Sequence, residues 1–183
     1  MKKQIRILAA AGALALALPV SAQTRFPANR EQGAAMSETT AKSFLTEAAK
    51  GGLAEVALGR LAAQKASNAA VKAFAQQMVT DHSKAGEEVK ALAATKSIPL
   101  PTAIDAKHQT EHDRLAAMSG AAFDKAYVDA MVADHEKDVA EFKHQATMNQ
   151  DPDVKVWAHK TLPTLEAHLN KVKSLQKSLG TTN

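Results

Sequence analysis

Four side chains with metal-binding chemistry interrupt otherwise apolar helical patterns in this sequence. Following each long helical stretch in alternating steps of three and four residues gives an apolar series, broken near its middle by Glu55, His82, His135 or His168. Burying one carboxylate and three imidazoles is costly unless these groups pair or bind a ligand. One cation would satisfy all four, since three histidines and a carboxylate are typical ligands of Zn, Fe, Mn or Cu. The sequence therefore predicts a metal site made by these four residues.

Three further residues near these four form a second tier of candidate ligands. Asp138 follows His135 by one helical turn and is the best additional acid, while Met78 and Met131 each precede a histidine by one turn. A thioether beside an imidazole favours copper, although methionine at a core position more often fills space. The expected cofactor is thus one divalent or copper ion. Three more acids lie on other helix faces and suit contacts outside the ligand shell: Asp81, Asp134 and Glu166.

Two alternatives to a simple metal-binding protein stay open. In one, Glu55 pairs with a protonated histidine and the polar series is structural, which gives an interaction module without metal. In the other, an open metal position supports a redox enzyme. The sequence lacks the Glu-x-x-His pair of di-iron proteins, a nucleophile motif and a phosphate-binding glycine loop. No catalytic residue is therefore assigned. A pair at i,i+4, His108 and His112, is expected on a solvated polar face.

The composition predicts packed helices. Alanine and long unbranched residues dominate, aromatic residues make up 4% of the chain, and cysteine is absent. Two pairs of long helices flank a long connection that carries a shorter helix, which is the ferritin-like four-helix plan with one crossover between helices 2 and 3. The expected ranges are 38–66, 69–95, 121–148 and 152–179 for the long helices and 103–118 for the short one.

The first 22 residues have the pattern of a Sec-type signal peptide. Lys2, Lys3 and Arg6 precede an apolar run, and Val20-Ser21-Ala22 places small residues at the expected cleavage site. Residues 23–37 are expected to form a flexible linker, and residues 38–180 the bundle. The expected location is therefore the periplasm, including a peripheral association with the outer membrane.

Charge and hydropathy disfavour two classes of binding partner, nucleic acid and the membrane interior. The whole chain carries 23 Lys and Arg against 19 Asp and Glu, and cleavage after Ala22 would remove three of the basic residues. The remaining near-neutral chain has no basic stripe with aromatic platforms, which disfavours nucleic acid. No later segment is apolar enough for membrane insertion. Since export is expected, a protein of the cell envelope is the expected class of partner.

Four stretches of the sequence resemble a secreted bacterial family. That family consists of ferritin-like four-helix bundles of unknown function, often labelled predicted outer membrane protein. The resemblance covers about residues 43–175 and implies export, a four-helix bundle and no established activity. Its motif positions include the four predicted ligands. The matching stretches are FLTEAAKGGLAEVALGRL at 44–61, VKAFAQQMVTDH at 71–82, GAAFDKAY at 120–127 and TLPTLEAHL at 161–169.

Overall fold

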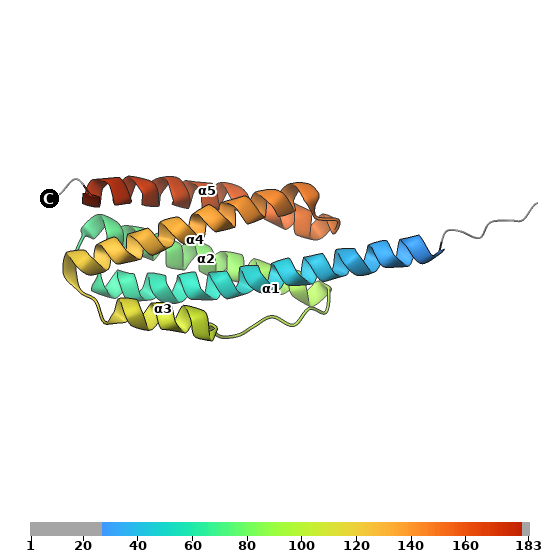
Figure 1. The fold of residues 1–183 in the computed structure, drawn as a ribbon, viewed down its shortest axis with the longest axis horizontal. Helices are drawn as coiled ribbons and strands as arrows, with labels where there is room; N and C mark the ends of the chain where they lie inside the picture. Colours follow the sequence, from blue (N-terminus) through green and yellow to red (C-terminus); the bar gives the residue numbers. More distant parts are fainter. Residues whose placement is uncertain (1–26, 181–183) are drawn as a thin grey trace, which may run out of the picture.

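A computed structural model describes residues 27–180, and these residues form an all-helical bundle (Figure 1). The expected fold class is confirmed, including the long connection with its short helix. The long helices α2, α4 and α5 begin and end within one residue of the expected positions. The five helices are α1 (Pro27–Lys65), α2 (Ala69–Thr95), α3 (Ala106–Ala116), α4 (Gly120–Met148) and α5 (Pro152–Gly180).

The first helix is longer than the sequence patterns indicated. We expected a linker up to residue 37, but α1 begins at Pro27 and extends beyond the ends of the other helices (Figure 1). Proline is favoured in the first helical turn, and the segment that follows is rich in Ala, Glu, Gln and Arg, which are strong helix formers. A lack of large apolar residues therefore did not mean a lack of helix. The expected signal peptide, residues 1–22, lies outside the described residues.

The bundle consists of two antiparallel hairpins. Helix α1 packs mainly on α2, and α4 mainly on α5, while contacts between α2 and α5 provide the largest share of the contact between the hairpins. The connection from α2 runs back along the bundle, and α3 lies against its outside beside α1 (Figure 1). This arrangement lets side chains from α1, α2, α4 and α5 meet in one interior.

Local sequence signals explain where the helices begin. The side chain of Asn68 accepts hydrogen bonds from the backbone N–H groups of Ala70 and Val71 and caps α2. Asp151 caps α5 by accepting from Asp153 and Val154, with Pro152 in the first turn. Asn and Asp are favoured at helix N-caps and Pro in the first turn, so these helix starts could be placed from the sequence.

A buried aspartate ties the first hairpin to α4. Asp124 is 1% exposed. Its Oδ1 accepts from Ser67 N at 3.0 Å, and its Oδ2 accepts from Asn68 N at 2.8 Å and from the Ser67 hydroxyl. The loop between α1 and α2 is thereby held against the first turn of α4. Such charge-assisted bonds are stronger than bonds between neutral groups.

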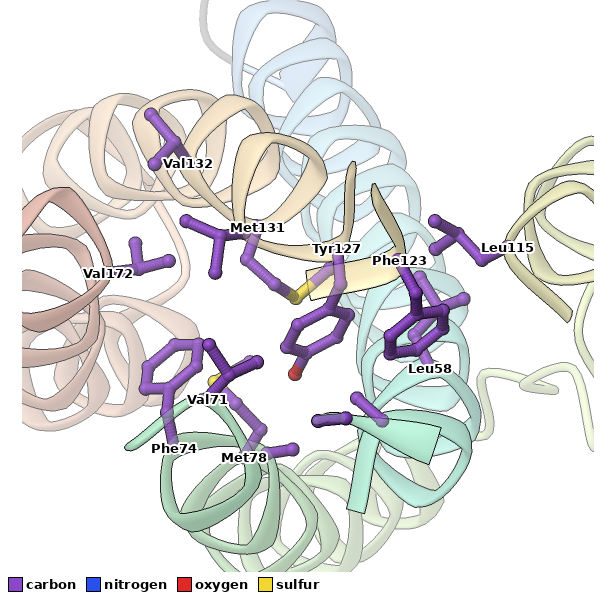
Figure 2. Close-up of a cluster of buried hydrophobic side chains, with 14 residues drawn as sticks. Leu58, Val71, Phe74, Met78, Leu115, Phe123, Tyr127, Met131, Val132 and Val172 are labelled. Carbon is purple, nitrogen blue, oxygen red and sulfur yellow. The ribbon is translucent and has the colours of Figure 1, made fainter. Parts of the chain in front are cut away.

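Two apolar clusters fill the bundle, one toward each end. One contains Phe74, Tyr127 and Met131, with their neighbours from all five helices. Figure 2 shows its aromatic rings and methionine sulfurs facing one another between the helices. The other is built around Phe44, Phe142 and Trp157, whose ring centroids lie 5.0–5.7 Å apart. The polar groups described below lie between these two clusters.

One glycine allows α1 and α2 to approach closely. A Cβ on Gly59 would lie 3.0 Å from Val79 Cγ2 and 3.1 Å from the backbone oxygen of Ala75. Neither atom can move freely, because the valine rotamer is restricted in a helix and the oxygen belongs to a packed backbone.

Gly59→Ala is therefore expected to lower the free energy of unfolding by about 1–2 kcal/mol despite the better helix propensity of alanine. Urea unfolding followed by circular dichroism measures the change. The matched control is Gly52→Ala, because a Cβ on Gly52 meets no atom within 4 Å. The control should raise stability by about 0.5–1 kcal/mol. A stabilised Gly59→Ala would contradict the packing argument.

No helix within residues 27–180 is long and apolar enough to cross a membrane.

Candidate metal centre

The structure brings the four residues that interrupt the apolar patterns to one place in the bundle. Glu55 comes from α1, His82 from α2, His135 from α4 and His168 from α5, and each side chain is at most 6% exposed. The three imidazole ring centroids lie 5.3–5.5 Å from one another. Each residue sits between the two apolar clusters, so the polar layer is enclosed on both sides along the bundle axis.

Two of the histidines face each other with one nitrogen each. His135 Nε2 lies 3.4 Å from His168 Nδ1, which is long for a hydrogen bond. The other nitrogen of each ring already has an oxygen partner. His135 Nδ1 lies 3.0 Å from the backbone oxygen of Met131, and His168 Nε2 lies 2.8 Å from Asp81 Oδ2. Because an N–H must point at each oxygen acceptor, His135 Nε2 and His168 Nδ1 carry lone pairs that face each other.

His82 completes this arrangement. Its Nδ1 lies 2.7 Å from Glu55 Oε2. Its Nε2 is buried without a hydrogen-bond partner among the described residues. A buried nitrogen without a partner is rare and requires an explanation. All three rings therefore follow one scheme, in which one nitrogen contacts a protein oxygen and the other is available.

Burial keeps the three imidazoles neutral. It lowers the pKa of His82 to about 4 and that of His135 to about 4. Burial also lowers the pKa of His168, although its hydrogen bond to Asp81 opposes this effect. Neutral imidazole is the form that binds a metal ion. At neutral pH these rings need not lose a proton in order to bind one.

The nearby carboxyl groups differ in charge. Burial raises the pKa of Glu55 to about 7, and the charge of His135 opposes it. Burial likewise raises the pKa of Asp138 to about 7. Burial acts in the same direction on Asp81, but hydrogen bonds from His168 and Gln77 outweigh it and hold the pKa of Asp81 below its ordinary value. Asp81 is thus a charged partner for the His168 ring.

The spacing of the histidines suits a metal ion. One ligand atom from each of the three rings lies within 4.8 Å of the other two. In a tetrahedral site with metal–nitrogen bonds of about 2.05 Å, ligand nitrogens are about 3.3 Å apart. The distance of 3.4 Å between His135 Nε2 and His168 Nδ1 is close to that value. One of the three spacings thus already suits a tetrahedral site, and the three buried histidines could hold one metal ion if His82 adjusts to it.

The structure gives Glu55 a position beside this group. It is not one of the residues, among those described, whose ligand atoms lie mutually within 4.8 Å. Its Oε2 contacts His82, while its Oε1 is buried without a hydrogen bond and lies 3.5 Å from His135 Nδ1. A carboxylate in this position orients the imidazole and makes it a better ligand. Direct ligation by Glu55 stays a prediction.

The second-tier residues have separate surroundings. Met78 and Met131 are fully buried in the apolar cluster of Figure 2, and the Met131 backbone oxygen contacts His135. Asp138 is half-buried beside the site and faces a cavity. Ligation by any of these three stays a prediction. His108 and His112 are half-buried on α3 and pair with Asp105 and Asp113, at 2.8 and 3.2 Å.

A cavity of about 550 Å³ adjoins the histidines. His82 and His168 form part of its wall, together with Glu55, Asp81 and Asp138. The sign of this cavity in the sequence is the pair Gly51-Gly52, which permits either a close approach of helices or room for a ligand beside Glu55. The structure shows open space, because a Cβ on either glycine would meet no atom within 4 Å.

Asp81 was expected on another helix face than His82, with contacts outside the ligand shell. It contacts His168 of the other hairpin, since successive helical residues point about 100° apart. The Met131 carbonyl contact could not be predicted, since it depends on a ring rotamer.

Comparison with known families identifies the domain. The model of the domain of unknown function DUF4142 matches residues 26–175. The chain belongs to the DUF4142 family. No curated protein matches the sequence.

A solved structure is similar to this DUF4142 chain in fold. It is the crystal structure of a DUF305 fragment from Deinococcus radiodurans, which superposes with a TM-score of 0.66 at 12% sequence identity. The match covers 75% of this chain and 95% of the other. At that identity, the likeness concerns the helical fold alone.

Proposed function

We propose that this DUF4142 domain is an exported metal-binding protein that holds one ion between its two hairpins. The ligands are His82 Nε2, His135 Nε2 and His168 Nδ1. The proposal rests on the shared scheme of the three rings, in which one nitrogen of each ring has an oxygen partner. The second nitrogens of His135 and His168 face each other, and that of His82 has no partner among the described residues. A metal ion at this place would supply His82 Nε2 with a partner.

The contacts outside the ligands support the same conclusion. Glu55 Oε2, the Met131 carbonyl and Asp81 Oδ2 would each accept the remaining N–H of one ligand ring. Such contacts fix the tautomer and orientation of metal-bound histidines. Three neutral imidazoles with a free fourth position suit Zn²⁺ best, and copper is the nearest rival.

Metal handling in the periplasm, or protection of the envelope from metal stress, is the physiological role that we propose. The signal-like pattern of residues 1–22 supports export. The absence of a motif for covalent or phosphate chemistry favours binding over catalysis.

Elemental analysis tests the proposal directly. Protein purified without a His-tag or chelator, and then offered Zn²⁺, Cu²⁺, Fe²⁺ or Mn²⁺, should retain about one equivalent of a single metal after gel filtration. The Glu55→Gln/His82→Ala double variant should retain none. If the wild-type protein retains no metal under any of these conditions, the polar layer is structural and the alternative of an interaction module replaces this proposal.

Asp81→Ala should weaken metal binding without removing a ligand. Loss of the carboxylate partner of a ligand histidine typically lowers affinity about 10- to 100-fold, because the ring is no longer held in one tautomer. Competition with a chromogenic chelator measures the affinity. Asp113→Ala on α3 is the matched control and should bind like the wild type. Unchanged affinity in Asp81→Ala would show that His168 is not a ligand.

A further inference from the structure

The cavity beside the histidines has features of a binding site for a small molecule. Its volume of about 550 Å³ lies within the range of small-molecule pockets. It reaches from His82 and His168 to Phe44 and Trp157, so a polar inner end is continuous with an aromatic wall. Such a combination orients a ligand by its polar end and holds its body by apolar contact.

Glycine residues keep this cavity open. Gly51 and Gly52 of α1 and Gly86 of α2 line it, and a Cβ added to any of them would meet no atom within 4 Å. Gly59 of α1 differs from them, because close packing leaves no space for a Cβ at that position. Glycine lowers helix stability by about 1 kcal/mol relative to alanine. No close contact requires glycine at these three positions. We therefore infer that the open space beside them is itself needed.

The charges at the wall restrict the ligand. Five carboxyl side chains line the cavity, against a single lysine, Lys137. The five are Glu47, Glu55, Asp81, Asp138 and Glu141. An anion would be repelled by this lining, whereas a neutral molecule would not.

The histidines leave one place for such a ligand. Three protein ligands leave the fourth position of a tetrahedral ion free. His82 and His168, two of the three, border the cavity. Neither Glu55 nor Asp138 belongs to the group of described residues whose ligand atoms lie mutually within 4.8 Å, although both line the cavity. The fourth position is therefore open to a ligand that enters through the cavity.

On the basis of the metal site proposed above, we propose that the cavity admits a small, flat, uncharged nitrogen heterocycle, whose ring nitrogen takes the free coordination position and whose body lies against Phe44 and Trp157. The cavity thereby determines which molecules reach the ion.

Cobalt provides the spectroscopic test. Co²⁺ in a site of three histidines has visible absorption bands that change when a fourth ligand binds. The purified protein is loaded with Co²⁺ and titrated with imidazole, 4-phenylimidazole and azide. We expect 4-phenylimidazole to bind about ten-fold more tightly than imidazole, since its phenyl ring is buried in the cavity. Azide should bind more weakly than either. Gel filtration after each titration verifies that Co²⁺ is retained.

A cavity-filling variant isolates the role of the hollow. Gly51→Leu/Gly86→Leu should keep its Co²⁺ and lose the ten-fold advantage of 4-phenylimidazole. Gly180→Leu at the end of α5 is the matched control and should behave like the wild type. If the double variant does not fold, Gly86→Leu alone serves the same comparison.

The outcomes separate the two proposals. If Co²⁺ is not retained, both the metal site and this inference fail. If Co²⁺ is retained but no probe changes its spectrum, the coordination shell is closed, and only this inference fails. Tighter binding of azide than of imidazole, or equal binding of 4-phenylimidazole by the wild type and the filled variant, likewise overturns it.

Discussion

Saturating Zn²⁺ should raise the melting temperature of this protein by about 10 °C. A ligand present at about 1,000 times its dissociation constant stabilises the folded state by about 4 kcal/mol if the unfolded chain does not bind it. For a chain of this size, each kcal/mol shifts the melting temperature by about 2–4 °C. Differential scanning calorimetry of the chelator-treated protein, with and without Zn²⁺, measures this shift.

The His135→Ala variant should lose most of the zinc response. His135 is fully buried, and its removal leaves only two of the three clustered histidines. The variant should also melt lower than the wild type without metal, because the change leaves a cavity. His159→Ala is the control, since His159 is exposed on the same bundle and outside the cluster. A full zinc response in His135→Ala would place the ion elsewhere, with His108 and His112 on α3 as the next candidates.

Asp124→Ala should produce a large loss of stability, although Asp124 lies outside the metal site. The variant loses three hydrogen bonds from Ser67 and Asn68 to a carboxylate that is 1% exposed. Two of the donors are backbone N–H groups, and both would lose the bond that holds this loop against α4. The expected decrease in the free energy of unfolding is about 3 kcal/mol.

Urea unfolding measures this decrease, and two variants calibrate it. Asp124→Asn keeps one good acceptor oxygen and should lose about half as much stability. Asp153→Ala changes an aspartate with a side chain that is 67% exposed, so its effect should stay within about 0.5 kcal/mol. An Asp124→Ala protein as stable as Asp153→Ala would show that the loop does not depend on this contact.

The helical pattern made the clustering of the histidines predictable. A polar residue that interrupts the apolar series of a helix is expected to be buried, because its neighbours on the same helix face are buried. His82, His135 and His168 each break such a series near its middle, and the middles of antiparallel helices meet. Burial of all four interrupting residues follows from the same argument.

The same pattern could not predict the positions of individual atoms. The apolar series of a helix gives the direction of a side chain but not its rotamer, so it does not show which histidine nitrogen is free to bind a metal. Glu55 shows the difference, since one helix position is compatible with a direct ligand and with a partner of the His82 ring. The extent of the cavity could not be predicted either, because it depends on the space that Gly86 of α2 and the aromatic side chains of α1, α4 and α5 leave unfilled.

Because the candidate metal site is divided between the two hairpins, a bound ion would affect the rate at which the bundle unfolds. His82 and its partner Glu55 belong to the first hairpin, while His135 and His168 belong to the second. Each hairpin is built from contacts close in sequence, which form early in folding, but the ion can be held only after the hairpins dock. A stabilising contact that is absent from the transition state slows unfolding and leaves the folding rate unchanged. The bound ion would therefore slow the separation of the two hairpins and lengthen the lifetime of the folded bundle.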